Sequence, residues 1–290
     1  NLMELYEKTN ENEKLENIIR DFEKLFNKNF VSTLYGGHIS YKKESFIEVI
    51  ENLKSLVIEN DNKLELDRVN LLAKSYDKID DIENAFLYFE KTNMLNLKSK
   101  NKEIDKNNFL NKINNRINFF TKIKNDNSSL VKTHYEYKPV FMIGFPRSGT
   151  TLLDTILRSH QMIEVIEEKH MMEKLINSLK RLTNNSVKEI YNVDNQKIKE
   201  LGKNYFRELQ SYSKNFDSSK IYIDKLPLNI IYIAEIIRVF PNAKFVISIR
   251  HPCDCVLSCY MQNFKLNDSM SNFLNLDDAA NTYNLVMNLL

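Results

Sequence analysis

Residues 140–153 read Val140-Phe-Met-Ile-Gly144-Phe-Pro-Arg147-Ser-Gly149-Thr150-Thr151-Leu-Leu153. An apolar run rich in β-formers leads into a loop that has a glycine at each end. Apolar residues then recur at helical spacing, at Leu152, Leu153, Ile156 and Leu157. We therefore predict a strand, a phosphate-binding loop and a helix, in that order.

The predicted loop has the chemistry of an anion site. Its glycines are spaced as in a P-loop, but Thr150 stands where that motif has a lysine. Tight glycine turns let several N–H groups converge on an anion, and the following helix adds its positive N-terminal end. The hydroxyls of Ser148, Thr150 and Thr151 can donate further hydrogen bonds, and Arg147 brings a permanent cation. The sequence thus predicts an anion cradle without a built-in Mg²⁺ site; the alternative is a strand-to-helix turn that needs only its glycines.

Length and composition restrict the classes of protein to consider. The chain has 290 residues, 42% of them hydrophobic and 11% aromatic, which is enough for a sizeable core and for two domains. A formal net charge of +2 gives no bulk electrostatic reason to bind nucleic acid or an anionic membrane. No apolar run approaches the roughly 20 residues of a spanning helix, and the polar residues 1–7 are not typical of a signal peptide. We expect a cytoplasmic protein that has neither nucleic acid nor a membrane as a partner.

The three cysteines, Cys253, Cys255 and Cys259, lie close together in the sequence. An odd, clustered set is not typical of a disulfide framework. Cys255 and Cys259 share a helix face, but no histidine lies at a useful spacing for a shared metal ion. We expect reduced, mostly buried thiols and no bound metal.

The first part of the chain carries helical periodicity and almost no strand pattern, so it is predicted to be all-α. Within it, Ala73, Tyr76, Ala85 and Phe89 are similar to the small and aromatic positions of one tetratricopeptide repeat. Small residues let two antiparallel helices approach, and the rings fill the gap between them. One period earlier the same positions carry other residue types, so an ordinary helical hairpin is the alternative.

A polar break at residues 125–129 is predicted to separate two domains. They are a helical, tetratricopeptide-like region at 1–125 and a second domain at 135–290 that begins with the phosphate-binding loop. The predicted fold class is α/β, with a P-loop-like parallel sheet that is flanked by helices and preceded by the all-α region.

The sheet is predicted from two further apolar runs in the second domain. Residues 220–224 and 243–249 have strand patterns, and the largely apolar residues 228–240 between them are predicted to be a helix. Amphipathic patterns predict two more helices, around 171–179 and 198–209. Strand, helix, strand indicates a parallel sheet buried on both faces, with ligands at the carboxyl ends of its strands.

Two motifs resemble those of sulfotransferases, the enzymes that transfer a sulfuryl group from 3′-phosphoadenosine 5′-phosphosulfate (PAPS). Phe145-Pro-Arg-Ser-Gly-Thr-Thr-Leu152 resembles their 5′-phosphosulfate loop, and residues 241–258 are similar to their strand and helix that hold the 3′-phosphate. The resemblance implies that the 5′-phosphosulfate is held by Arg147, Ser148, Gly149, Thr150 and Thr151, and the 3′-phosphate by Arg250 and Ser258.

Three residues are candidates for catalysis, Glu168, Arg147 and Lys225. Sulfuryl transfer between two oxygens depends on positioning and charge neutralisation, and it requires no metal. Arg147 and Lys225 are candidates for stabilising charge on the bridging oxygen and the departing phosphate. Glu168 matches the second Glu of the Gly-Glu-Glu segment in tyrosylprotein sulfotransferases, which is their proposed general base. Glu167 and His170 are the other candidates, and an acidic helix start without a catalytic role is the alternative.

The whole arrangement resembles bacterial sulfotransferases that have an N-terminal tetratricopeptide region. This implies a hydroxyl acceptor on a protein tyrosine, a sugar or a small molecule, and a peptide or protein as the partner that the helical region could bind. A P-loop kinase-type phosphotransferase and a non-catalytic tetratricopeptide interaction module are the other functions. A helix begins near Leu276 and the chain ends at Leu290, so we expect a fragment that lacks the family's C-terminal part.

Overall fold

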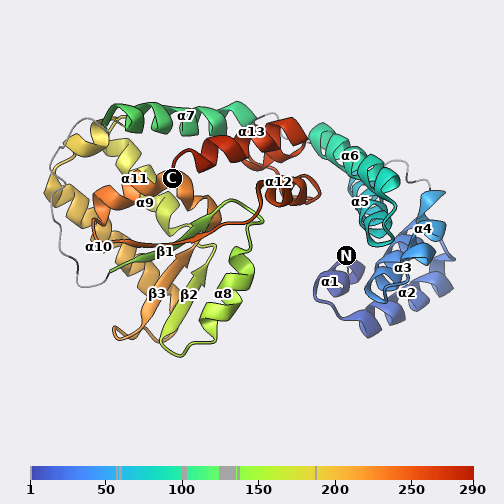
Figure 1. Ribbon diagram of the computed structural model, residues 1–290. Coiled ribbons are helices and arrows are strands. Elements are labelled where there is room, and N and C mark those ends of the chain that lie inside the picture. The colour runs from blue at the N-terminus through green and yellow to red at the C-terminus, as the bar shows by residue number, and fades with distance from the viewer. Residues whose placement is uncertain are drawn as a thin grey trace. The chain divides into compact units, whose positions relative to one another are not determined.

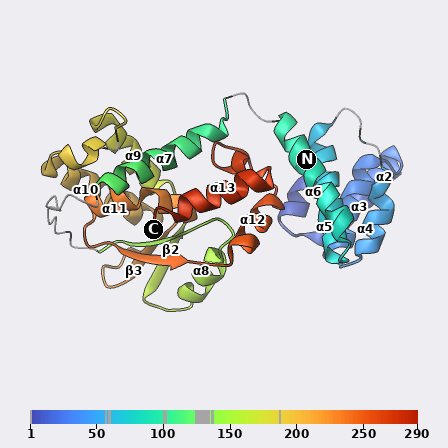
Figure 2. The same ribbon diagram turned by 45° about the horizontal axis from the view of Figure 1, so that its top comes forward.

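The structure, a computed structural model, describes residues 2–56, 58, 61–99, 103–123, 135, 138–186 and 188–290. The chain forms two compact units. Unit 1 consists of Asn1–Asp105 and Tyr260–Asn275, and unit 2 consists of Lys106–Cys259 and Leu276–Leu290. The elements of each unit can be followed from two directions in Figures 1 and 2.

The N-terminal part of unit 1 is helical, as predicted. Its helices are α1 (Leu2–Lys8), α2 (Asn12–Phe26), α3 (Phe30–Lys42), α4 (Phe46–Lys54), α5 (Asn62–Lys78) and α6 (Ile82–Ser99). Side-chain caps begin α3, α5 and α6: Asn29 Oδ1 accepts a hydrogen bond from Val31 N at 2.9 Å, Asp61 caps α5, and Asp81 Oδ1 accepts a hydrogen bond from Asn84 N at 3.2 Å. Gly37 lets helix α3 approach α4 closely, since a Cβ added at this position would lie only 2.9 Å from Leu53 Cδ1.

The hairpin of α5 and α6 contains the residues of the predicted repeat. Ala73 and Ala85 are buried between the helices of the unit. The rings of Tyr76 and Tyr88 stack with their centroids 5.3 Å apart, and Phe89 is also buried. The small and aromatic residues therefore pack as expected for a helical hairpin, while its assignment as a tetratricopeptide repeat stays a prediction.

Unit 1 also contains a segment from much later in the sequence, Tyr260–Asn275, which includes the 3-10 helix η3 (Met270–Phe273). The ring of Tyr260 stacks on that of Phe86 of α6, with the centroids 5.7 Å apart. The Asp105 backbone N–H donates to Asp268 Oδ1 at 3.0 Å. This segment had been predicted to belong with the second domain.

Helix α7 (Lys106–Ile123) belongs to unit 2. Arg116 of α7 forms an ion pair with Glu235, and both side chains are at most 5% exposed. The two compact units have other bounds than the predicted domains at 1–125 and 135–290, and the assignment of those domains stays a prediction. The predicted break at residues 125–129 lies outside the described residues.

The sheet of unit 2 has four parallel strands in the order β2-β3-β1-β4. The strands are β1 (Val140–Gly144), β2 (Ile163–Glu167), β3 (Ile221–Lys225) and β4 (Lys244–Ser248). Three of them confirm predicted strands, but β2 was not predicted. In the register, Gly144 pairs with Ser248, and Lys225 pairs with Glu167 on one side and Met142 on the other. The carboxyl ends of all four strands thus lie along one edge.

Helices cover both faces of this sheet, as predicted for the fold class. They are α8 (Thr150–Arg158), α9 (Met171–Leu182), α10 (Asn195–Tyr212), α11 (Ile233–Val239), α12 (Pro252–Tyr260) and α13 (Leu276–Met287), with 3-10 helices η1 (Lys188–Asn192) and η2 (Pro227–Tyr232). On one face, Leu153 and Leu157 of α8 pack against Met142 of β1. On the other, Phe141 of β1 lies among aromatic rings that include Phe240. The single helix predicted at 228–240 is divided into η2 and α11.

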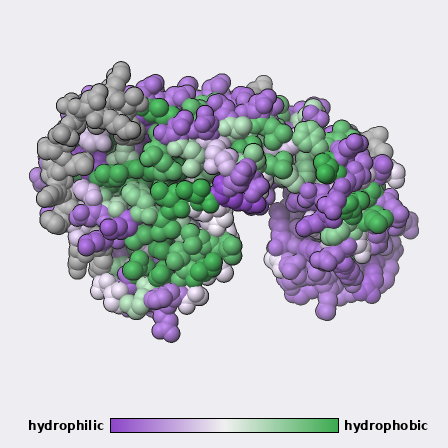
Figure 3. All heavy atoms as spheres, viewed as in Figure 1, coloured by the Kyte–Doolittle hydropathy of each residue, from purple (hydrophilic) through white to green (hydrophobic). Residues whose placement is uncertain are grey.

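Some apolar side chains of unit 2 face outward. Leu152 and Ile156 of α8 are 67% and 58% exposed, and Ile247 of the edge strand β4 is 40% exposed. Figure 3 shows hydrophobic side chains gathered over α8 and the neighbouring sheet on the face in view. The prediction of a sheet buried on both faces therefore does not hold for β4.

Asp224, next to the end of β3, is fully buried on the aromatic face of the sheet. Tyr205 Oη of α10 donates to Asp224 Oδ2 at 2.8 Å, and Asp224 Oδ1 has no hydrogen-bond partner in the described part of the chain. Burial raises the pKa of the Asp224 carboxyl to about 7, although the Tyr205 hydrogen bond opposes this. The folded protein therefore holds a proton that the unfolded chain releases.

We expect Asp224→Asn to flatten the pH dependence of stability between about pH 4 and pH 7. In this window the folded wild type binds more protons than the unfolded chain, so its free energy of unfolding falls as pH rises, by at most about 4 kcal/mol. Urea unfolding at several pH values compares the two proteins. Parallel curves would show that the Asp224 carboxyl titrates alike in the folded and unfolded states.

Candidate functional site

The loop between β1 and α8 is fixed by two unusual backbone positions. Gly149 has φ 95°, in the region that favours glycine, and Arg147 has φ 67°. The Ser148 N–H donates to the Phe145 carbonyl oxygen at 3.2 Å, which closes the turn. Helix α8 begins at Thr150, so the loop leads directly to a helix N-terminus. This geometry matches the predicted strand, loop and helix.

The start of the loop is tightly packed against β4. A Cβ on Gly144 would lie 2.8 Å from the Ser248 carbonyl oxygen and 2.9 Å from Ser148 Oγ. Ser248 Oγ donates to the Ser148 carbonyl oxygen at 2.8 Å. The strand end therefore requires glycine for close approach, and β4 holds the loop backbone in place.

Ser148 has an unused hydroxyl within this loop. Its side chain is 5% exposed, and its Oγ has no hydrogen-bond partner among the residues the structure describes. A buried hydroxyl without a partner is unfavourable by about 1–3 kcal/mol. An anion seated in the loop would accept a hydrogen bond from it, so this hydroxyl fits the predicted phosphate-binding role.

The two predicted motifs, far apart in the sequence, come together in unit 2. Arg147 Nε of the loop donates to Ser258 Oγ of α12 at 2.9 Å. Arg250 Nη1 lies 3.5 Å from the Arg147 carbonyl oxygen, and its Nε lies 3.3 Å from Asp254 Oδ2. Arg147 and Arg250 are both exposed. Within the described ranges, no acidic side chain forms an ion pair with Arg147, so its guanidinium can pair with an external anion.

Lys225 and Glu168 also lie close together, at the ends of β3 and β2. Lys225 is 1% exposed, and its Nζ lies 2.6 Å from Glu167 Oε1, 3.6 Å from Glu168 Oε1 and 3.9 Å from Asp154 Oδ2. The hydrogen bond from Lys225 lowers the pKa of the Glu167 carboxyl. Glu167 is therefore held as an anion that anchors the lysine.

Among the base candidates, Glu168 and His170 have different surroundings. The Glu168 N–H donates to the Lys225 carbonyl oxygen at 2.8 Å, its φ is 49°, and its side chain is 60% exposed. Its carboxylate thus lies beside Lys225 and is open to solvent. His170 is 74% exposed, and its Nδ1 lies 2.9 Å from Glu173 Oε2 of α9.

Two charged residues near Lys225 and Glu167 had not been predicted, Asp154 and Arg158. The Asp154 side chain is buried, and it forms an ion pair with Arg158 one turn later on α8. Arg158 Nη2 also lies 3.6 Å from Glu167 Oε2. Their spacing of four residues is a recognisable signal for a helix pair. It does not indicate that Lys225 lies beside them, because β3 is distant in the sequence.

The described residues contain no group of three or more His, Cys, Asp or Glu side chains that could hold a metal ion. Burial raises the pKa of the Cys255 thiol and raises that of Cys259 to about 12. Both are free thiols, and Cys253 is an exposed one. In the part of the chain that the structure covers, no helix is long and apolar enough to cross a membrane.

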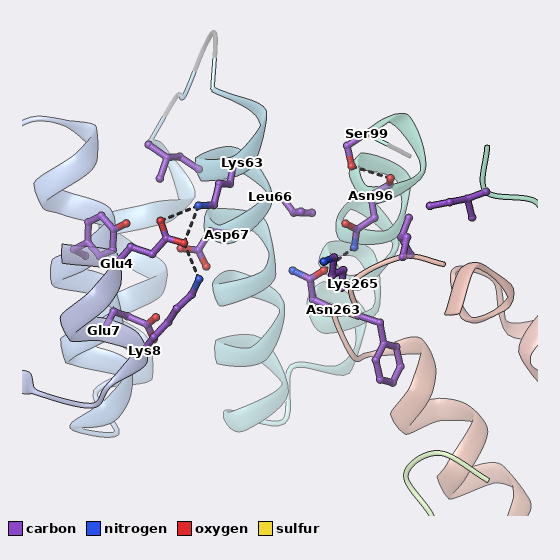
Figure 4. A pocket seen from close by; sticks show the side chains of 15 residues that line it. Glu4, Glu7, Lys8, Lys63, Leu66, Asp67, Asn96, Ser99, Asn263 and Lys265 are labelled. Carbon is purple, nitrogen blue, oxygen red and sulfur yellow. Dashed lines mark hydrogen bonds and ion pairs between the residues drawn. The ribbon is translucent and has the colours of Figure 1, made fainter. Parts of the chain in front are cut away.

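Each unit contains a pocket. In unit 2, a pocket of about 520 Å³ borders β2 and is lined by Glu167 and by cationic Lys169, Lys214 and Lys220. In unit 1, a pocket of about 750 Å³ is lined by α1, α3, α5, α6 and part of the segment Tyr260–Asn275. Figure 4 shows the ion pairs of Glu4 with Lys8 and Lys63 at one side of the unit 1 pocket, and Asn96 and Asn263 at the other.

Comparisons with known proteins identify a family and several relatives. Residues 139–290 match the model of a family described as the sulfotransferase family. A protein of Aquifex aeolicus (strain VF5), named only as an uncharacterized protein, is 33% identical over 138 residues, which are 45% of this chain and 18% of that protein. Protein-tyrosine sulfotransferase 1 of Mus musculus and of Homo sapiens are each 28% identical over 120 residues, which are 40% of this chain and 32% of theirs. This chain thus covers 32% or less of the length of these relatives.

We expect Gly144→Ala to lower the free energy of unfolding by about 1–3 kcal/mol, because the added Cβ would meet the Ser248 carbonyl oxygen, a backbone atom of the β1–β4 pair. Gly36→Ala in α3 is the matched control, since nothing lies within 4 Å of its added Cβ. There, alanine should stabilise the helix by about 0.5–1 kcal/mol. Thermal unfolding measures both, and changes of the same sign would contradict the close approach at Gly144.

Proposed function

Because this chain belongs to the sulfotransferase family, we propose that it transfers the sulfuryl group of PAPS to a hydroxyl acceptor. The observation that carries this proposal is the 2.9 Å hydrogen bond between Arg147 of the β1 loop and Ser258 of α12. It brings the two predicted anion-binding motifs together, which supports a donor with phosphates at its 5′ and 3′ positions.

The donor would be held by the residues predicted from the sequence. The loop residues Arg147, Ser148, Gly149, Thr150 and Thr151 would hold the 5′-phosphosulfate, supported by the unpaired Ser148 hydroxyl and the N-terminus of α8. Arg250 and Ser258 would hold the 3′-phosphate. PAPS supplies the activated sulfuryl group, and no metal is part of the proposal.

The catalytic roles follow from the charges at the same edge of the sheet. Arg147 and Lys225 stabilise the negative charge that grows on the bridging oxygen and the departing phosphate. Lys225 is well suited because β3 fixes its backbone and Glu167 fixes its Nζ. Glu168 accepts the proton of the attacking hydroxyl, since its carboxylate is accessible and lies beside Lys225.

The acceptor is a hydroxyl of a protein tyrosine, a sugar or a small molecule. A peptide or protein acceptor would be held by the helical unit, whose 750 Å³ pocket presents charged side chains of both signs (Figure 4). We also propose that the helical unit is a tetratricopeptide-like region and that the protein is cytoplasmic. Neither nucleic acid nor a membrane is proposed as a partner.

We expect adenosine 3′,5′-bisphosphate to bind without Mg²⁺, and Arg250→Ala to weaken its binding about 10- to 100-fold, because a charged hydrogen-bond donor to phosphate is lost. Isothermal titration calorimetry measures both affinities. Arg207→Ala, at an exposed arginine of α10, is the matched control and should leave the affinity unchanged. Binding that requires Mg²⁺ and prefers ATP would support a kinase instead, and no loss in Arg250→Ala would exclude this residue from the site.

We expect Glu168→Gln to lower the rate of sulfuryl transfer about 10²- to 10⁴-fold and to leave bisphosphate binding unchanged, because the general base is lost while the donor site is intact. The assay follows labelled sulfate from PAPS to a tyrosine peptide, a sugar or 4-methylumbelliferone, whichever the wild type uses. His170→Gln is the matched control and should retain activity. Loss of activity in His170→Gln with a fully active Glu168→Gln would move the base to the histidine.

A further inference from the structure

Helix α12 ends in the helical unit. The helix spans Pro252–Tyr260, and its last residue, Tyr260, belongs to unit 1 together with the segment that follows. Tyr260 is 5% exposed. Its backbone carbonyl oxygen accepts a hydrogen bond from Asn93 Nδ2 of α6 at 3.0 Å, and its ring stacks on Phe86, which lies two turns before Asn93 on the same helix.

This hydrogen bond lies where a helix most needs an external partner. The last four carbonyl groups of an α-helix have no partner within the helix, so its last turn unwinds easily unless other groups bind them. Asn93 is 4% exposed and supplies a side-chain donor to the final carbonyl group of α12. The ring of Phe86 stacks on the Tyr260 side chain and so holds the residue whose carbonyl group Asn93 binds.

Ser258 lies in this last turn of α12, two residues before Tyr260. Its Oγ accepts the hydrogen bond from Arg147 Nε, and in the proposed function it binds the 3′-phosphate of the donor. Cys259 between them is fully buried, with its Sγ 3.5 Å from the Pro146 carbonyl oxygen. The Ser258 hydroxyl thus lies in the same helical turn as the carbonyl group that Asn93 binds.

We propose that Asn93 and Phe86 of the helical unit are positioning residues for the 3′-phosphate site, and that they act through Tyr260 by holding the last turn of α12 in helical form. The inference rests on the proposed function, because it takes Ser258 as a ligand of the 3′-phosphate. It gives the helical unit a role in donor binding in addition to any role in binding an acceptor.

Asn96 provides a matched control on the same helix. It is 5% exposed, close to the value for Asn93, and its Nδ2 donates to Asn263 Oδ1 at 2.8 Å (Figure 4). This bond also joins α6 to the segment Tyr260–Asn275, but at a residue beyond the end of α12. Loss of the Asn96 bond should therefore destabilise unit 1 without disturbing the turn that holds Ser258.

The experiment compares two nucleotides on the full chain. Calorimetry gives the dissociation constants of adenosine 3′,5′-bisphosphate and of adenosine 5′-phosphate, which lacks the 3′-phosphate. Their ratio isolates the contribution of the 3′-phosphate, which a general loss of stability does not change. The variants are Asn93→Leu, Phe86→Leu, Asn96→Leu and, as the benchmark, Ser258→Ala. Phe86 is 45% exposed, so its substitution keeps the test valid if Asn93→Leu does not fold.

We expect Ser258→Ala and Asn93→Leu each to reduce the preference for the bisphosphate about fivefold, the effect of one lost hydrogen bond, with a smaller loss in Phe86→Leu and none in Asn96→Leu. A preference that falls only in Ser258→Ala would overturn the inference and leave the proposed function intact. An equal fall in Asn96→Leu would overturn it as well. A wild type without any preference for the bisphosphate would overturn both the inference and the assignment of Ser258.

Discussion

The parallel pairing of β1 with β4 is the constraint on which the rest of the site depends. It places Gly144 opposite Ser248, so the chain leaves both strands at the same edge of the sheet. The approach is close enough that only glycine fits at the end of β1, and Ser248 Oγ then holds the loop backbone. The Arg147 side chain consequently reaches α12, which begins shortly after β4. The proposed site for two anionic groups would thus follow from the strand register.

Lys225 shows how the same edge accommodates a buried charge. A lysine that is 1% exposed would be unfavourable in an apolar setting, because it loses its hydration. Here three carboxylates, those of Glu167, Glu168 and Asp154, lie within 4 Å of its Nζ, and Arg158 in turn neutralises Asp154. The group is therefore a network in which each buried charge has a partner. Removal of any one carboxylate would change the balance for the others, so their contributions are not expected to add.

Local patterns predicted much of this molecule, and contacts between distant residues explain what they missed. The strand, loop and helix around Gly144, the strands β3 and β4 and the helical N-terminal part all follow from periodicity and turn chemistry. The strand β2 was missed because its sequence mixes apolar and acidic residues at Ile163–Glu167. The neighbours of Lys225 were missed because their proximity is set by the pairing of β2 with β3. Tyr260–Asn275 binds the buried side-chain amides of Asn93 and Asn96 in α6. These contacts could not be predicted from the periodicity of the sequence.

Unit 1 is discontinuous in the sequence, and this affects how the protein is made. Helices α1–α6 leave the ribosome before the strands β1–β4, whereas Tyr260–Asn275 is synthesised after those strands. Until then the side chains of Asn93 and Asn96 have no Tyr260 carbonyl or Asn263 side chain to bind, and Phe86 has no ring to stack on. Completion of the helical unit during biosynthesis consequently follows the synthesis of β1–β4.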